Sequence, residues 1–250
     1  DKGCRFIQKC YKKGIKVCPM INVGPAKSWM HNPDHENVLS EEFKAQTKEG
    51  FSKFSHGIGA DFSNILQCID YASRLDGSFV EVGCFRGSSS CVSANYMNKL
   101  AINKKFYVYD YFNGFTYNEA RKSPDYIWSN THETEGRDTI KKRILSRGIK
   151  KNQLHVFQRN IIEQDSLKEV DKISFANLDV DMYEAVLHGL LRIHEKLIVG
   201  GIILVEDKGH TPQLLGACVA LTEFLDEVGF NKYFSLHLDS GQQLLLRISK

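Results

Sequence analysis

The stretch SFVEVGCFRGSSSCVSANYMNKL, residues 78–100, decides the fold that the sequence predicts. Residues 78–82 form a short apolar run typical of a buried strand, and residues 88–100 follow as a predicted helix. Glycines between the two elements let the backbone turn tightly. A strand that passes through a glycine loop into a helix is the opening of a strand–helix–strand unit.

The same alternation continues along the chain. Further strands are predicted at 105–110, 154–157, 173–179 and 201–207, with helices near 135–147, 183–196 and 213–228. Two strand-like runs then flank the hairpin signal Asp239-Ser240-Gly241. We therefore predict an α/β fold: a doubly wound, mostly parallel seven-stranded sheet that ends in an antiparallel hairpin.

The segment before this alternation is different in character. Residues 1–35 are the least regular part, a helix is predicted to open at Ser40, and a second helix covers about 61–74.

Composition excludes several classes of protein. The 250 residues are 42% hydrophobic and 25% charged, with a net charge of +3, which is ordinary globular composition. No basic run favours nucleic acid, and no apolar stretch approaches the ~18–20 residues of a membrane span. The seven cysteines form no CxxC pair, and DKGCRFIQKC is not a signal peptide. We expect reduced thiols and a cytoplasmic protein.

The loop after the first strand has the chemistry of a ligand-binding turn. Glu81, Gly83 and Gly87 are spaced E-x-G-x-x-x-G, which differs from the G-x-G-x-x-G of NAD-binding loops. Ser88 is expected to cap the helix that follows. A carboxylate ahead of the loop suits a ligand with a cationic amino group, such as S-adenosylmethionine. The alternative is a plain tight turn between strand and helix.

Asp110 ends the second predicted strand. An acid at this position can accept hydrogen bonds from both ribose hydroxyls of a nucleotide, as in dinucleotide-binding folds. Together with the first loop, Asp110 indicates a nucleoside-containing ligand.

Acidic residues also end the fourth and fifth predicted strands. Asp179 and Asp181 share strand parity, and Glu206 and Asp207 end the neighbouring strand. Carboxylates that gather at one sheet edge suit Mg²⁺, Mn²⁺ or Ca²⁺. The alternative for Asp181 is an N-cap of the helix that follows.

The combined motifs resemble a known family. EVGCFRGSS, YDYFNGF, LDVDMY, and VGGIILVEDKG followed by GACVALTEF are similar to the metal-dependent class I O-methyltransferases of the macrocin (TylF-like) family. The resemblance covers about residues 61–250. It implies a Rossmann-like S-adenosylmethionine-dependent methyltransferase that acts on sugar hydroxyls of natural products.

The resemblance also implies roles for individual residues. Asp179, Glu206 and Asp207 fall on metal ligands, and Asp181 falls on the catalytic base. Glu206-Asp207-Lys208 stands where family members usually have Asp-Asp-Tyr. The location of His210 makes it an acceptor contact or secondary base. The donor-binding positions are expected to be Glu81, Gly83, Cys84, Arg86, Gly87, Ser88, Ser89, Asp110, Asn160 and Asp179.

The expected organisation follows from the same resemblance. Residues 1–60 form a helical lid or acceptor-binding extension, and residues 61–250 form the methyltransferase domain, which can form a homodimer. The acceptor is a small molecule that carries a sugar or vicinal diol, and no nucleic acid or membrane is involved. Alternatives are a catechol-like phenol acceptor, a non-catalytic S-adenosylmethionine-binding scaffold, and an NAD-dependent oxidoreductase. The last alternative would require a G-x-G-x-x-G loop, which the sequence lacks.

Overall fold

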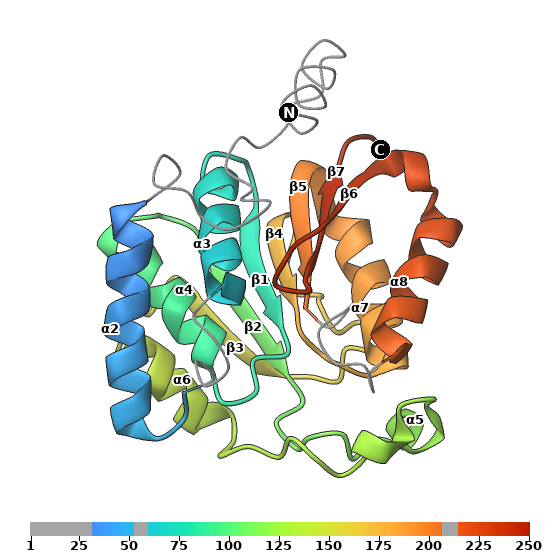
Figure 1. Ribbon diagram of the computed structural model, residues 1–250, viewed down its shortest axis with the longest axis horizontal. Coiled ribbons are helices and arrows are strands. Elements are labelled where there is room, and N and C mark those ends of the chain that lie inside the picture. Colours follow the sequence, from blue (N-terminus) through green and yellow to red (C-terminus); the bar gives the residue numbers. More distant parts are fainter. Residues whose placement is uncertain (1–31, 53–59, 207–214) are drawn as a thin grey trace.

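Seven strands form one sheet in the order β3-β2-β1-β4-β5-β7-β6 (Figure 1). The computed structural model describes residues 32–52, 60–206 and 215–250. Strands β1 to β5 are parallel, and β7 lies antiparallel between β5 and β6. This order confirms the predicted doubly wound sheet with a C-terminal antiparallel hairpin. The strands are β1 (Ser78–Val82), β2 (Phe106–Asp110), β3 (Leu154–Gln158), β4 (Ile173–Leu178), β5 (Leu197–Val205), β6 (Tyr233–His237) and β7 (Gln243–Arg247).

Helices cover both faces of the sheet. Figure 1 shows one group of helices on one side of the strands and the pair α7 and α8 on the other. The first group is α2 (Pro33–Glu49), α3 (Ala60–Ala72), α4 (Ser88–Lys99) and α6 (Arg137–Leu145). The second is α7 (Tyr183–Lys196) and α8 (Leu215–Val228). Three short helices complete the described chain: α5 (Asn118–Lys122), η3 (Tyr126–Trp128) and η4 (Phe230–Lys232).

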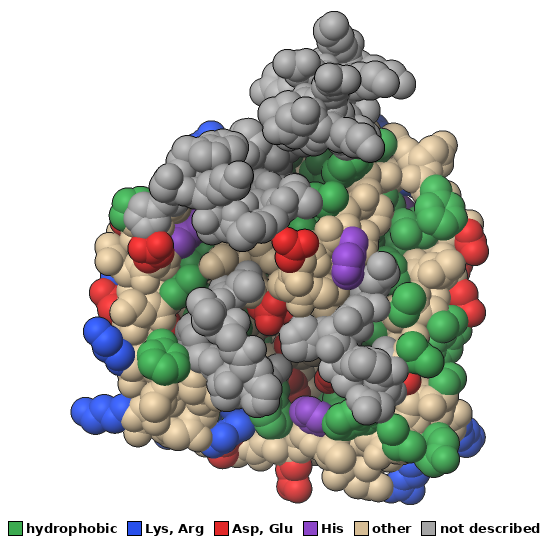
Figure 2. Space-filling view, in the orientation of Figure 1, with side chains coloured by type: hydrophobic (Ala, Val, Ile, Leu, Met, Phe, Trp, Pro, Cys, Tyr) green, Lys and Arg blue, Asp and Glu red, His purple; other side chains and the backbone are tan. Residues whose placement is uncertain are grey.

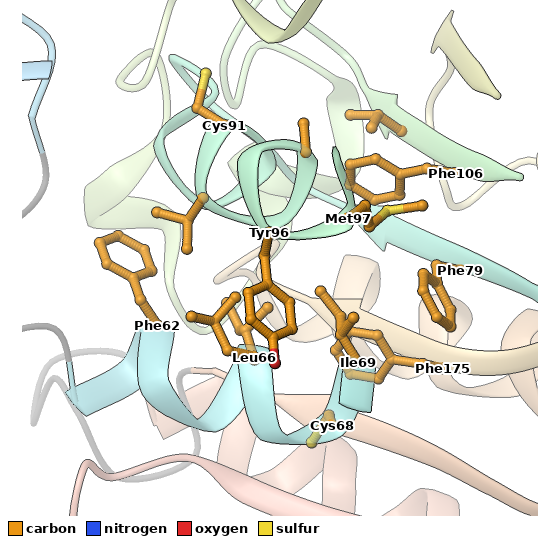
Figure 3. Packing of buried hydrophobic residues seen from close by; sticks show 14 of the residues in the cluster. Phe62, Leu66, Cys68, Ile69, Phe79, Cys91, Tyr96, Met97, Phe106 and Phe175 are labelled. Atoms are coloured by element: carbon orange, nitrogen blue, oxygen red, sulfur yellow. The ribbon is translucent and has the colours of Figure 1, made fainter. Parts of the chain in front are cut away.

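Two hydrophobic clusters lie on the two faces, because successive strand residues point to opposite sides. Phe79 and Phe175 face α3 and α4, where they lie close to Ile69 and Met97 (Figure 3). Val80 and its neighbours of the same parity pack instead under α7 and α8. The sheet is therefore buried on both faces, which is why its parallel strands read as continuous apolar runs.

The first described helix begins earlier than predicted. Ser40 was the expected start, but α2 begins at Pro33. Asn32 is the N-cap, and its side-chain oxygen accepts a hydrogen bond of 3.0 Å from the backbone N–H of Asp34. Proline at the first helical position needs no donor and has a suitable φ, so Asn32-Pro33 is a start signal that the prediction overlooked.

Helix α2 packs against the same hydrophobic cluster as the sheet. Val38 is fully buried in the same cluster as the sheet residues. Glu42 is 1% exposed and pairs with Arg147 at 3.1 Å, while its other oxygen accepts from Asn95 at 2.8 Å. Described residues before and after position 60 thus pack in one hydrophobic cluster, and the division of the chain at residue 60 stays a prediction. The lid or acceptor-binding role of residues 1–60 also stays a prediction, and residues 1–31 and 53–59 of this segment lie outside the described residues.

Strand β5 also begins earlier than predicted. The prediction placed its start at Gly201, whereas the strand runs from Leu197. Gly200 has φ +88°, and the pairing with β4 shifts register between Ile173 and Phe175. The two glycines mark an irregularity inside one strand, a usual role of glycine in sheets.

The outer face of α8 is partly apolar. Leu215 is 67% exposed and Val219 is 47% exposed. Figure 2 shows hydrophobic side chains gathered over this helix. Among the described residues, no helix combines the length and apolar character that a membrane span requires.

Candidate active site

A pocket opens at the carboxyl ends of β1 to β4. The space between its walls, counted out to the open mouth and including solvent there, is about 660 Å³. Open α/β sheets bind ligands at this edge. Each strand contributes to the wall: Gly83 after β1, Asp110 at the end of β2, Asn160 after β3, and Asp179 and Asp181 after β4.

Gly83 is required by the close approach of two strand ends. Its φ is +86°, and a Cβ atom there would lie 1.8 Å from the backbone oxygen of Asp179. Any side chain would push the β1 loop away from the end of β4. The glycine thus lets the two segments meet at the floor of the pocket.

Asp110 fixes the loop after β1. One carboxylate oxygen accepts the backbone N–H groups of Cys84 and Phe85, both at 2.8 Å, and the other accepts that of Phe112 at 2.6 Å. Burial raises the pKa of Asp110, although these three hydrogen bonds oppose the shift. A carboxylate offers about four acceptor sites. The side chain therefore holds the loop and keeps limited capacity for a ligand hydroxyl.

Glu81 lies beneath the loop rather than in the pocket wall. Its side chain is 2% exposed and accepts hydrogen bonds from the hydroxyl of Ser90 and, at 3.3 Å, from the amide of Asn177. Burial raises its pKa to about 7, against the effect of hydrogen bonds that include one from Ser89. Glu81 and Ser89 do not line the pocket and support the loop from below, and their predicted contact with the donor stays a prediction.

Arg86 also points away from the pocket wall. Its guanidinium pairs with Glu135 at 2.7 Å and donates to the backbone oxygen of Gly50 at 3.1 Å. Arg86 lowers the pKa of Glu135 to about 2. The side chain ties the β1 loop to the end of α2 and to the segment before α6.

The start of α4 differs from the expectation in one detail. Gly87, with φ +83°, is the N-cap and Ser88 is the first helical residue. The Ser88 hydroxyl donates to the side chain of Gln46 in α2, so it does not cap α4. Cys84 contributes its backbone N–H to the Asp110 contact, while its thiol is buried.

Asp181 sits in a tight turn between β4 and α7. Its φ is +57°, uncommon for a residue with a side chain, and the N–H of Met182 donates to the oxygen of Val180 at 2.6 Å. The N-cap of α7 is Met182. The side chain that accepts the N–H of Tyr183 belongs to Asp125, not Asp181. The turn presents Asp181 at the pocket wall.

Asp179 and Glu206 follow positions that pair in the sheet. Leu178 pairs with Val205, so the two acids come next on neighbouring strands and on the same face. Glu206 accepts a hydrogen bond of 2.6 Å from the amide of Gln242. Carboxylate oxygens such as these are suitable ligands for a hard divalent cation.

The described residues supply only part of the predicted metal set. Within them, no group of three or more potential ligands gathers at one point. Asp207, the third expected ligand, and His210, the expected acceptor contact, lie outside the described residues.

The pocket contains residues that the sequence analysis did not select. The segment 111–136 between β2 and α6 contributes Phe115, Tyr117 and His132 to the wall. The hydroxyl of Tyr117 is buried and has no hydrogen-bond partner among the described residues. The aromatic residues between Tyr111 and Tyr117, directly after β2, were a signal for this wall, since ligand pockets are commonly aromatic.

Comparison with known proteins agrees with this geometry. A family model described as Macrocin-O-methyltransferase (TylF) matches residues 44–233. No curated protein sequence is significantly similar to the chain.

Solved structures share the fold. The O-methyltransferase NovP aligns with TM-score 0.68 and 16% identity, over 86% of this chain and 100% of that chain. The calicheamicin methyltransferase CalS11 aligns with TM-score 0.63 and 15% identity, over 92% and 100%. The SAH-bound methyltransferase PaMTH1 of Podospora anserina aligns with TM-score 0.54 and 13% identity, over 99% and 96%. Because the family model covers most of the chain, this protein belongs to the macrocin O-methyltransferase (TylF) family and is a methyltransferase enzyme.

Proposed function

We propose that the protein transfers a methyl group from S-adenosylmethionine to a sugar hydroxyl, with a divalent metal ion at the acceptor. The observation that carries the proposal is the pocket at the carboxyl edge of the sheet, where loops from β1, β2, β3 and β4 meet. This edge is where a nucleoside ligand of an open α/β sheet binds. Family membership supports the same chemistry.

The donor would be held by wall residues from three strand ends. Gly83 brings the β1 loop close enough for backbone contact, and Asp110 and Asn160 offer acceptors beside it. Glu81 lies below this loop and acts through it. When bound, S-adenosylmethionine supplies the electrophilic methyl group.

Asp181 would act as the general base. Its turn places it in the wall next to Asp179, and its carboxylate would take the proton of the acceptor hydroxyl. Asp179, Glu206 and Asp207 would hold the metal ion, which lowers the pKa of a bound hydroxyl. The aromatic side chains of segment 111–136 that line the pocket would exclude water from it. Much of the rate would come from placing the hydroxyl and the methyl group together.

The acceptor class is inferred from the family and from structural neighbours. NovP is named an O-methyltransferase, and CalS11 is named a TDP-rhamnose 3'-O-methyltransferase. These names describe those proteins. They motivate a nucleotide sugar or glycoside with neighbouring hydroxyls as the acceptor for this chain.

A methyl-transfer assay tests the proposal. The protein is incubated with labelled S-adenosylmethionine and TDP-rhamnose, and in parallel with catechol, each with Mg²⁺ or with EDTA. We expect labelled product from the sugar with Mg²⁺ and at most trace product with EDTA. If labelled product forms only from catechol, the acceptor is a phenol and not a sugar.

Two controls separate the parts of the proposal. Full activity in EDTA with protein shown to be metal-free would reject the metal step while leaving the methyltransferase intact. Calorimetry with S-adenosylhomocysteine and with NAD identifies the ligand of the pocket independently of any acceptor. Tight S-adenosylhomocysteine binding without transfer to any polyol would favour a non-catalytic scaffold.

A further inference from the structure

We propose that Asp125 is a positioning residue for the methyl-transfer reaction, because its buried carboxylate clamps α7 and α8 together behind the proposed base. The inference rests on the proposed function for its catalytic consequence. The clamp itself is a property of the fold and is testable without an acceptor.

The carboxylate of Asp125 caps two helices at once. One oxygen accepts the backbone N–H of Tyr183, the first residue of α7, at 3.1 Å. The other accepts the N–H of Gly216, the second residue of α8, also at 3.1 Å. Helix N-terminal N–H groups lack partners within their own helix and carry partial positive charge, so a single carboxylate satisfies both ends.

The fit around the clamp is close. Asp125 is only 2% exposed, although it comes from the loop between α5 and η3, at the surface of the molecule. A Cβ atom at Gly216 would lie 1.8 Å from a carboxylate oxygen of Asp125 and 2.7 Å from the Cβ of Tyr183. The second residue of α8 therefore has to be glycine for the carboxylate to reach both helices.

The clamp acts next to the reacting groups. Asp181 precedes Tyr183 by two residues, and its positive φ is a strained conformation that its surroundings must hold. Met182, the N-cap of α7, offers no side-chain hydrogen bond to this helix. The contact from Asp125 is thus a side-chain anchor of the turn that carries the base.

The same residue anchors the segment that supplies the aromatic residues of the pocket wall. Asp125 belongs to segment 111–136, and Tyr117 and His132 of that segment line the pocket. By fastening this segment to the start of α7, the clamp fixes the distance between Asp181 and the aromatic wall. A base misplaced by about 1 Å can lose about a hundredfold in rate without loss of ligand affinity.

The experiment compares Asp125→Ala and Asp125→Asn with two controls. Ser123→Ala removes the hydroxyl that accepts the N–H of Asp125 at 3.3 Å but leaves both clamp bonds in place. Ile144→Val perturbs a fully buried side chain of α6, remote from the clamp, and corrects for general destabilisation. Hydrogen exchange is measured for segments 179–190 and 215–222, and methyl transfer is measured with TDP-rhamnose as the probe.

We expect Asp125→Ala to raise exchange at the first turns of both helices together, with β1 and β2 unchanged. Its kcat should fall about 30- to 100-fold while the KM for S-adenosylmethionine stays within about threefold. Asp125→Asn keeps one acceptor oxygen and should fall between Asp125→Ala and wild type. Ser123→Ala should stay within about threefold of wild type.

Two results would overturn the proposal: increased exchange at neither helix or at only one, or a kcat loss in Asp125→Ala no greater than in Ile144→Val. If the wild-type protein does not methylate TDP-rhamnose, the proposed acceptor is wrong. Hydrogen exchange alone then decides whether Asp125 holds the two helix N-termini.

Discussion

Replacing Glu81 by glutamine should remove a pH-dependent penalty from the stability of the fold. Glu81 is 2% exposed, and burial raises its pKa from the ordinary 4.5 to about 7. The substitution keeps the shape of the side chain and an oxygen that can accept from Ser90 or Asn177. It removes the charge that the buried site disfavours and replaces one of the two acceptor oxygens by an amide NH₂ group.

The magnitude follows from the two pKa values of Glu81. Between pH 4.5 and about 7 the folded state keeps a proton that the unfolded state has lost, so the free energy of unfolding falls as pH rises through this window. Above pH 7 the penalty is constant. The difference between the two pKa values corresponds to about 3 kcal/mol. The side chain is buried, so solvent does not screen this effect appreciably.

The assay is urea unfolding, followed by circular dichroism, of wild type and Glu81→Gln at pH 5 and pH 8. We expect the difference in unfolding free energy, variant minus wild type, to rise by about 2.5 kcal/mol from pH 5 to pH 8, because part of the penalty is already present at pH 5. Comparing two pH values cancels changes in packing that the substitution causes. Glu135→Gln is the control, because its exposed carboxyl has a pKa of about 2 and does not titrate in this range. Equal pH profiles for Glu81→Gln and wild type would refute the reasoning.

Three further substitutions test the pocket. Tyr117→Phe removes a buried hydroxyl without a described partner, so it should stabilise the empty protein by about 1 kcal/mol; thermal unfolding that shows a loss of stability would mean that the hydroxyl is already satisfied. Gly83→Ala should abolish S-adenosylhomocysteine binding in calorimetry, since its Cβ would lie 1.8 Å from a backbone oxygen, and unchanged affinity would show that the loop is not part of the donor site. Asp181→Asn should lower turnover about 100- to 1,000-fold with donor affinity kept, because asparagine tolerates the positive φ; a turnover near wild type would remove Asp181 as the base.

The sheet could be predicted from the sequence because each parallel strand is buried on both faces. Residues 78–82 and 154–157 match observed strands to within one residue, since a short apolar run between turn signals has no other favourable place. The predicted start of β5 was wrong, because Gly200 and Gly201 resemble a strand boundary although the strand continues through them. The predicted start of α2 was also wrong, because Ser40 and the acidic residues after it resemble a helix start although the helix begins at Pro33.

The candidate site was predictable where it depends on strand ends. Gly83, Asp110, Asp179 and Asp181 meet in one pocket because parallel strands bring their carboxyl ends to one edge. The position of Glu81 below the loop depends on packing against α4, which local sequence does not reveal.

The clamp at Asp125 was beyond prediction for a related reason. Its partners Tyr183 and Gly216 lie 58 and 91 residues away in the chain. Sequence patterns identify residues that share an element or a sheet edge. They do not identify a loop carboxylate that meets two distant helices.

A crystal structure of the protein with S-adenosylhomocysteine and Mn²⁺, with anomalous scattering used to locate the metal, would test whether donor and metal bind side by side at the carboxyl edge of the sheet. We expect the nucleoside in the pocket between Gly83, Asp110 and Asn160, and Mn²⁺ bound by Asp179 and Glu206. S-adenosylhomocysteine bound elsewhere, or a filled pocket with Asp179 and Glu206 turned away from any metal, would contradict this expectation.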